Sequence, residues 1–136
     1  MTTLQTVMIM SSAKTLLAII EIGGYPDFSK LYQQAGYQVL KTNTMRKALS
    51  ILNKNHPAVI VAEFIFGPTH SFVVSNIDSL LAMLASKHPE TKLILFVDKT
   101  EVHHLEKLHQ RYADMVKVDW LFYPIESELL FKCLSG

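Results

Sequence analysis

Short apolar segments alternate along this sequence with segments in which apolar residues recur at helical spacing. The apolar segments are residues 15–22, 37–41, 58–64, 92–97 and 119–123. They are rich in β-branched and aromatic residues, which is typical of strands buried on both faces of a parallel sheet. Because neighbouring parallel strands need a crossover connection, usually a helix, the alternation predicts an α/β fold. We expect five strands and five helices, with the helices covering both faces of one doubly wound parallel sheet.

The segments between the predicted strands carry the start and stop signals of helices. We expect the five helices within residues 26–36, 43–52, 75–84, 101–112 and 126–134. Asn43 is a possible N-cap of the second helix. The apolar stripe of the last helix is expected to face the sheet and consists of Leu129, Leu130, Cys133 and Leu134. Cys133 is therefore expected to be a core residue rather than a nucleophile.

Length and composition narrow the class of protein. A chain of 136 residues, 49% of them hydrophobic and 18% charged, fits one folded domain and not a disordered tail. Thirteen Lys and Arg against twelve Asp and Glu give a formal net charge of +1, so neither nucleic acid nor a membrane is an expected partner. The single cysteine fits a reducing compartment, and no apolar segment is long enough for a signal-peptide core or a membrane span. We therefore expect a cytoplasmic protein.

The N-terminal segment has three possible structures. Residues 1–14 are compatible with a frayed extension, an added edge strand, or a true first strand that would make residues 12–22 a helix. We favour residues 15–22 as the first strand, because three of its last four residues are isoleucine and two glycines and a proline follow. The predicted organisation is an N-terminal extension or extra strand, residues 1–14, and one domain, residues 15–136.

In parallel sheets of this kind, ligands bind at the edge where the strands end. The residues at the predicted strand ends are Glu21, Glu63, Val97 with Asp98, and Tyr123 with Pro124. Glu63 is unusual because it follows the apolar run that begins PAVIVA, and glutamate is rarely buried without a partner. We expect functional residues at this edge. We also expect a cis peptide bond between Tyr123 and Pro124, since an aromatic residue before proline suits one.

Residues 15–135 resemble the receiver domain of bacterial two-component response regulators. The likeness rests on PAVIVAE, similar to the strand that ends on the phosphoacceptor Asp, on AGYQVL after the first helix, on KLILFVD, similar to strand four, and on LFYPIESELL, similar to the Lys-Pro segment. The resemblance implies a flavodoxin-like (βα)5 fold with strand order 2-1-3-4-5. It also implies signalling through a protein partner or a homodimer, formed by the face of helix four, strand five and helix five. Trp120 and Tyr112 lie in that region.

The resemblance fails at the residues that handle phosphate. A receiver has two acids after strand one, a phosphoacceptor Asp, a Ser or Thr after strand four and a Lys before the Pro. The residues at these positions are Glu21 and Ile22, Glu63, Val97, and Tyr123. Positioning and charge stabilisation carry phosphoryl transfer, so the extra methylene of Glu63 and the lost hydroxyl and Lys predict no productive phosphorylation. We expect a non-catalytic, receiver-like signalling and interaction module, not an enzyme.

The acids at the strand ends leave alternatives open. Glu63 is either a fixed carboxylate that imitates a permanently phosphorylated state or a solvated residue without a role. In strand order 2-1-3-4-5, Glu21, Glu63 and Asp98 should converge near one pocket, where Mg²⁺ or Ca²⁺ would find oxygen ligands. Otherwise water relieves their repulsion and no cofactor is expected. The alternative function is a small-ligand or divalent-cation sensor that uses this crevice.

Two loops beside the crevice also have alternative interpretations. Gly23 and Gly24 could bring backbone amides close to a phosphate, but a bare Gly-Gly favours a tight turn. Phe72, Val73 and Val74 lie in the long segment 67–76. They form a lid, are offered to a partner, or fold back onto the third helix.

The histidines form no recognisable metal motif. His103, His104 and His109 share a predicted helix, but no two of them stand four residues apart. The remaining histidines are expected in loops without Cys or His neighbours and are His56, His70 and His88. The sequence therefore predicts no zinc site.

Overall fold

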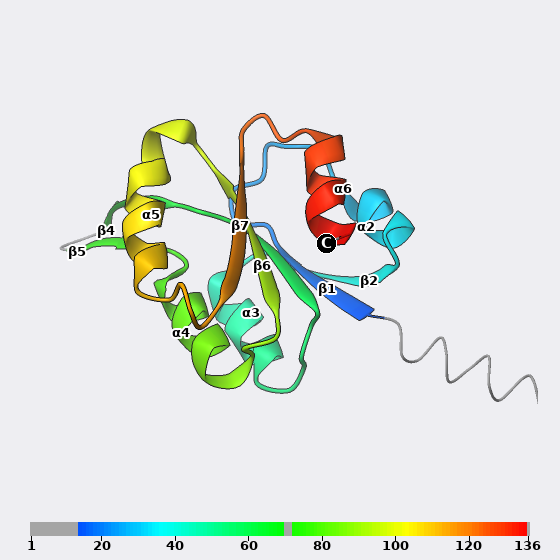
Figure 1. The fold of residues 1–136 in the computed structure, drawn as a ribbon, viewed down its shortest axis with the longest axis horizontal. Helices are drawn as coiled ribbons and strands as arrows, with labels where there is room; N and C mark the ends of the chain where they lie inside the picture. The colour runs from blue at the N-terminus through cyan, green and yellow to red at the C-terminus, as the bar shows by residue number, and fades with distance from the viewer. Residues whose placement is uncertain (1–13, 70–71, 136) are drawn as a thin grey trace, which may run out of the picture.

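The computed structural model describes residues 14–69 and 72–135, and its main sheet has five parallel strands. The strands are β1 (Lys14–Ile19), β2 (Tyr37–Thr42), β3 (Val59–Glu63), β6 (Lys92–Val97) and β7 (Lys117–Phe122). They lie in the order β2-β1-β3-β6-β7, which is 2-1-3-4-5 when the strands of this sheet are counted along the chain. The predicted doubly wound parallel sheet and its strand order are therefore confirmed (Figure 1).

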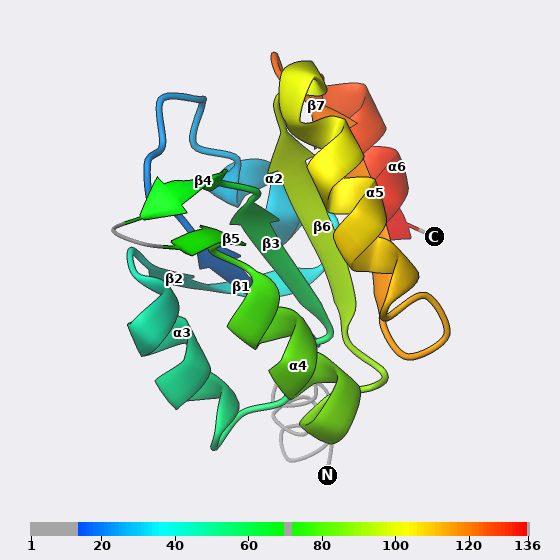
Figure 2. The same cartoon turned by 90° about the vertical axis from the view of Figure 1, so that its left-hand side faces the viewer.

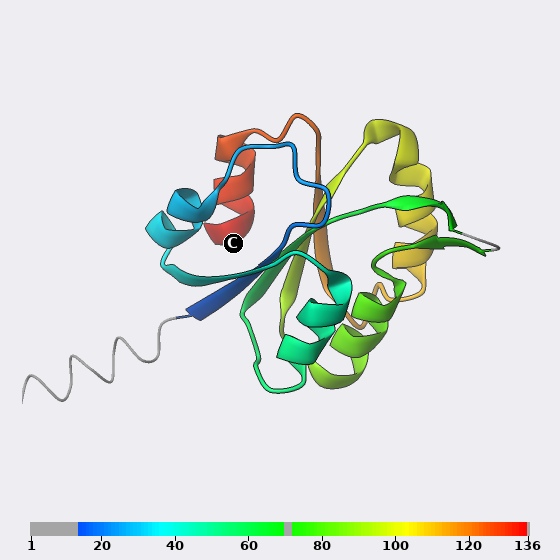
Figure 3. The ribbon, with the colours of Figure 1, turned by 180° about the vertical axis from the view of Figure 1, so that it is seen from behind.

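Helices cover both faces of the sheet within the described residues. They are α2 (Ser29–Gln34), α3 (Met45–Leu52), α4 (Asp78–Lys87), α5 (Val102–Gln110), which follows the 3₁₀ turn η1 (Lys99–Glu101), and α6 (Ser127–Ser135). Figures 1 and 3 show α2 and α6 on one face and α3, α4 and α5 on the other. No helix in the described part of the chain is long and apolar enough to cross a membrane.

The central strands are buried on both faces because successive side chains point to opposite sides. Leu93 and Leu95 of β6 pack in the layer beneath α3, α4 and α5. Ile94 and Phe96 pack in the layer beneath α2 and α6. The apolar runs that predicted strands are thus continuous because each strand supplies two cores at once.

Three local predictions differ from the structure. β1 ends at Ile19, three residues before the predicted end, and the side chain of Ile22 is exposed. The N-cap of α3 is Thr44, whose hydroxyl accepts a hydrogen bond from the Lys47 N–H, and not Asn43. Leu129 is 44% exposed, whereas Leu130 and Leu134 are buried. Residues four apart share one face of a helix, so the core-facing stripe of α6 leaves Leu129 outside.

A β-hairpin replaces the loop expected between β3 and α4. β4 (Phe66–Thr69) pairs antiparallel with β5 (Phe72–Ser75), and Figure 2 shows the hairpin near the end of β3. The ring of Phe66 stacks on His104 of α5, with centroids 3.7 Å apart, which ties the hairpin base to that helix.

Two expectations fall outside the described part of the structure. The lid or partner role of Phe72, Val73 and Val74 concerns side chains outside that part, although their backbone forms β5. Residues 1–13 are also outside it, so the prediction for the N-terminal segment stays a prediction.

Candidate functional site

The carboxylate of Glu63 is buried at the carboxyl edge of the sheet and is held by three donors. The residue ends β3 and is 2% exposed. Its Oε1 accepts a hydrogen bond from the Ile22 N–H at 2.8 Å. Its Oε2 accepts from the Gly23 N–H at 3.1 Å and from the Tyr25 hydroxyl at 2.6 Å. These bonds supply the partner that a buried glutamate needs.

The loop after β1 is shaped to supply these donors. Gly23 and Gly24 have φ values of 73° and 87°, in the left-handed region that glycine adopts without strain. Successive backbone N–H groups in such a turn form a concave anion site. Here the N–H groups of Ile22 and Gly23 bind a carboxylate of the same chain. The φ values of both glycines agree with the interpretation of Gly-Gly as a turn. The anion bound by the Ile22 and Gly23 N–H groups is the Glu63 carboxylate.

Two backbone N–H groups and the Tyr25 hydroxyl bind the Glu63 carboxylate, and no charged side chain among the described residues pairs with it. Glu63 takes part in no ion pair among the described residues. Burial, and then the hydrogen bond and charge of Glu63, raise the pKa of Tyr25 far above its usual value. Burial, followed by the charges of Glu63 and Asp98, raises the pKa of Tyr123 to about 12. Both phenols are therefore neutral at pH 7, and Tyr25 keeps the proton that it donates.

Glu21 is drawn into the base of the hairpin. Its Oε1 accepts a hydrogen bond from Asn76 Nδ2 at 2.6 Å, and the same Nδ2 donates to the Glu63 carbonyl at 2.7 Å. Asn76 Oδ1 accepts from the Ile65 N–H at 2.7 Å. Asn76 therefore connects β3, the hairpin and Glu21. Sequence reasoning missed it, because it lay at the end of the segment interpreted as a loop.

Asp98 is engaged in local hydrogen bonds. Its Oδ1 accepts from the Thr100 N–H at 2.9 Å and from the Thr100 hydroxyl at 2.7 Å, which caps the turn η1. These two bonds lower the pKa of the Asp98 carboxyl below its usual value. The carboxylate is thus bound to its own loop.

A cavity of about 740 Å³ opens at this edge of the sheet. Its wall includes Glu63, Asp98, Tyr123 and Pro124, but not Glu21 or Val97. The predicted convergence of acids thus holds for Glu63 and Asp98, while Glu21 turns to Asn76. Val97 is fully buried in the core. The peptide bond between Tyr123 and Pro124 is cis, as predicted.

The residues present do not fit the Mg²⁺ site that a receiver domain uses. Glu21 is bound to Asn76, the neighbouring Ile22 has no ligand atom in its side chain, and both Glu63 oxygens accept hydrogen bonds. Within residues 14–69 and 72–135, no group of three or more His, Cys, Asp or Glu side chains is placed to hold a metal ion.

The structure brings together two histidines that the sequence placed in separate loops. His56 Nδ1 lies 2.9 Å from His88 Nδ1, and His88 Nε2 lies 2.7 Å from the Leu52 carbonyl oxygen. A carbonyl only accepts, so His88 carries its proton on Nε2, and His56 donates from Nδ1. The expectation that these residues lack His neighbours was therefore wrong. No sequence pattern indicates the pair, because the two residues are 32 positions apart. His70 lies outside the described residues.

The face expected to bind a partner contains both half-buried and exposed apolar side chains. Trp120 and Tyr112 are half-buried and pack against the core. The exposed apolar side chains of this face include Phe122 of β7, 38% exposed, and Leu129 of α6. Both line a shallow cavity of about 370 Å³ that Trp120 also borders.

Comparison with known proteins identifies similar structures but no relative by sequence. No family model and no curated protein matches the chain. The chemotaxis protein CheY4 of Vibrio cholerae has a TM-score of 0.67 at 21% identity, over 90% of this chain and 97% of CheY4. A response regulator receiver protein of Sinorhizobium medicae has a TM-score of 0.65 at 16% identity, over 92% of this chain and 94% of that chain.

A third similar structure represents a family of streptococcal redox sensors that evolved from two-component response regulators. It has a TM-score of 0.63 at 14% identity, over 89% of this chain and 49% of that chain. At these identities the likeness is one of fold. The chain therefore has the CheY-like fold of response regulator receiver domains.

Proposed function

We propose that this protein is a signalling module of receiver fold that acts by binding a protein partner and takes no phosphoryl group. One observation carries the proposal: Ile22, Gly23 and Tyr25 donate hydrogen bonds to the two oxygens of Glu63. A phosphoacceptor must present an oxygen lone pair in line with the phosphodonor. The donors at this strand end instead bind both oxygens of the Glu63 carboxylate and hold it in place.

The neighbouring residues support the same conclusion. A phosphoryl group needs hydrogen bonds and positive charge around it. At the corresponding positions, the side chain of Val97 is apolar and buried, and Tyr123 is a neutral phenol. Neither side chain supplies positive charge to an acyl phosphate.

Glu63 therefore acts as a built-in anion. Its negative charge sits in an amide site of the chain itself and is present whether or not a phosphodonor is. In this proposal the signal is the binding or release of the partner. The conformation of the module itself does not change. The streptococcal redox sensors are a precedent for a receiver-like fold that works as a sensor of another kind.

The test is incubation with acetyl phosphate and Mg²⁺, followed by intact-mass spectrometry, with a phosphorylatable receiver domain as positive control. We expect no phosphoryl adduct and no change in the backbone NMR spectrum on adding beryllofluoride. A stoichiometric acyl phosphate on Glu63 would overturn the proposal.

The partner face that we propose comprises α5, β7 and α6, and its exposed apolar residues include Phe122 and Leu129, which line one cavity. Sedimentation of the wild type and of Phe122→Asp tests whether the partner is a second copy. Leu40→Asp is a matched control, because Leu40 is similarly exposed but lies on β2, at the other edge of the sheet. Loss of a dimer in the first variant alone supports this face. A dimer that survives in both variants rejects it.

A second candidate function is a small-ligand sensor at the 740 Å³ cavity. The observation that favours it is the wall, whose described residues include the aromatic residues Tyr25, Phe66 and Tyr123 and no Lys or Arg. A thermal-shift screen with nucleotides, Mg²⁺, Ca²⁺ and small organic cations tests it. A ligand at one hundred times its Kd adds about 2.7 kcal/mol to the free energy of unfolding. No shift with any of these probes favours the interaction module.

A further inference from the structure

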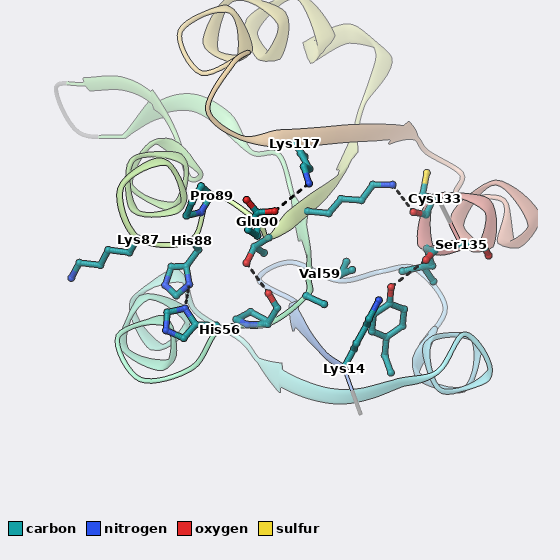
Figure 4. A pocket seen from close by; sticks show the side chains of 16 residues that line it. Lys14, His56, Val59, Lys87, His88, Pro89, Glu90, Lys117, Cys133 and Ser135 are labelled. Atoms are coloured by element: carbon teal, nitrogen blue, oxygen red, sulfur yellow. Dashed lines mark hydrogen bonds and ion pairs between the residues drawn. The ribbon is translucent and has the colours of Figure 1, made fainter. Parts of the chain in front are cut away.

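A second cavity, of about 660 Å³, lies at the opposite edge of the sheet, where the strands begin. The starts of β1, β6 and β7 border it, together with the loops that precede β3 and β6 and the end of α6. Figure 4 shows this cavity from close by. It shares no lining residue with the cavity beside Glu63, so a ligand site here does not depend on the proposed function.

The charge of this cavity differs from that of the whole chain. Its lining includes four lysines, Lys14, Lys87, Lys92 and Lys117, and a single acid, Glu90. With histidines neutral the lining has a formal charge of +3, whereas the chain has +1, so the rest of the chain has −2. The near-neutral total therefore conceals a basic cavity.

The lysines differ in how firmly they are held. Lys92 Nζ donates to the Cys133 carbonyl at 2.6 Å and pairs with Asp119 at 3.0 Å, which fixes its charge in the wall. Lys117 lies 3.7 Å from Glu90, and both side chains are largely exposed. Lys14 makes no ion pair with another described residue. Such exposed charges are only weakly compensated.

Orientation and hydrogen bonding leave the cavity open to an anion. Figure 4 shows Lys14 and Lys117 extending into it from opposite sides, whereas Lys87 extends away from it. Two carbonyl oxygens at the end of α6, whose partial negative charge faces this end of the sheet, already accept hydrogen bonds. The Cys133 carbonyl accepts from Lys92 and the Leu134 carbonyl from the Tyr37 hydroxyl.

We infer that this cavity binds a small polyvalent anion, a molecule bearing two or more phosphate or carboxylate groups. Lys14 and Lys117 contact the ligand from opposite sides, and the anion displaces the exposed carboxylate of Glu90 from Lys117. Lys92 forms part of the wall, where Asp119 pairs with its charge. The volume lies in the range of small-molecule sites, about 300–1,000 Å³.

The experiment is titration of the full chain with inorganic tripolyphosphate at low ionic strength, followed by calorimetry and by ¹H–¹⁵N NMR. We expect saturable one-to-one binding that weakens as salt is added, with weaker binding of inorganic phosphate. The amides that shift should lie around residues 56–59, 87–92, 117 and 133–135. This map needs no variant and so does not depend on how a variant folds.

Two double variants test the assignment with the same change in net charge. Lys14→Glu with Lys117→Glu should weaken binding by about tenfold or more. Lys30→Glu with Lys107→Glu, at exposed positions that do not line this cavity, should change it by less than about twofold. The NMR spectra report whether each variant is folded.

Three outcomes would overturn the inference: no saturable binding of either tripolyphosphate or citrate at millimolar concentration, equal weakening by both double variants, or shifts that cluster elsewhere. Equal weakening would mean that the anion responds only to net charge. If tripolyphosphate does not bind but a citrate-type tricarboxylate does, at the same amides, the cavity is selective for carboxylate and the inference stands.

Discussion

The two edges of the sheet treat their charges in opposite ways. At the carboxyl edge the cavity wall contains Glu63, Asp98 and Glu101. Hydrogen bonds within the chain engage Glu63 and Asp98, and Glu101 lies 3.6 Å from His104. At the amino edge the wall contains four lysines, of which Lys92 alone is held by more than an exposed, long ion pair. At the carboxyl edge, groups of the same chain bind the acidic side chains. At the amino edge, exposed lysines remain available for the anion that we propose as a ligand.

The comparison shows that a position at a strand end does not decide whether a residue binds a ligand or stabilises the fold. The carboxyl edge is where ligands bind in folds of this kind, yet here a side chain occupies the amide site of the loop after β1. At that edge the Glu63 carboxylate therefore has a structural role, since it accepts the hydrogen bonds of the loop. The difference predicts that substitutions at the carboxyl edge change stability, while those at the amino edge change binding.

The largest effect should come from Glu63→Ala. The change leaves the N–H groups of Ile22 and Gly23 and the Tyr25 hydroxyl without their acceptor. Water from the cavity replaces part of the loss, so we expect the free energy of unfolding to fall by about 3 kcal/mol. Urea unfolding measures it. Glu63→Gln should cost less, because its amide oxygen still accepts. An unchanged midpoint in both variants would mean that the carboxylate is not a structural anion.

A smaller loss is expected from Tyr25→Phe. This variant keeps the ring, which packs edge-on against Phe96, and removes the 2.6 Å hydrogen bond to Glu63. A hydrogen bond to a charged group contributes about 1.5–3 kcal/mol, and we expect the lower end of that range in denaturant unfolding. Tyr123→Phe is the matched control, since its hydroxyl makes no hydrogen bond to another described residue and also borders the cavity. Equal losses in both variants would contradict a specific role of Tyr25.

The amino edge should confer sensitivity to acid through His88. Burial, with the nearby His56 and Lys87, lowers its pKa below 6.5, although the bond to the Leu52 carbonyl opposes this. The folded state disfavours the protonated form of His88. The contribution of neutral His88 to the free energy of unfolding is therefore fully present above pH 6.5 and is lost as the pH falls below 6.5.

We expect the free energy of unfolding to fall between pH 7 and pH 5 because the pKa of His88 is lowered in the folded state. Urea unfolding of the wild type and of His88→Gln over this range isolates the term. The lowered pKa values of Asp27 and Asp98 act only below their usual 3.8 and do not contribute in this window. Parallel pH profiles for the two proteins would show that His88 is not the group that titrates.

The smallest effect on stability should come from Lys117→Ala. Its ion pair with Glu90 spans 3.7 Å between exposed side chains, and such pairs contribute little. The change in the free energy of unfolding should stay within about 0.5 kcal/mol. A loss comparable to that of Glu63→Ala would remove the contrast between the two edges.

Sequence patterns predicted much of the fold, because they depend on neighbours in the chain. The apolar runs gave strands close to their observed limits, and β6 spans the predicted residues 92–97. The hairpin was missed, since Gly67 and Pro68 in a strand of four residues are typical of a loop. The end of β1 was placed too late because Ile22 suggested continued burial, whereas only its N–H is used.

The sequence identified residues of the candidate site but not the hydrogen bonds that connect them. Glu63 was identified from a carboxylate that closes an apolar run. Its partner Tyr25 lies 38 residues away, and Asn76 links to Glu21 across 55 residues. No local pattern marks such pairs, because parallel strands bring together loops that are distant in the chain. The pair of His56 and His88 was missed for the same reason.

The sequence by itself determined the alternation of strands and helices, the position of Glu63 at the end of an apolar run and the absence of a lysine and a hydroxyl at the receiver positions. These follow from side-chain chemistry and from local spacing. Only the tertiary structure decided that backbone amides hold the carboxylate and that lysines from separate strands gather in one cavity. The physical reason is that hydrogen bonding and electrostatic energy depend on distance in space, which the order of residues does not specify.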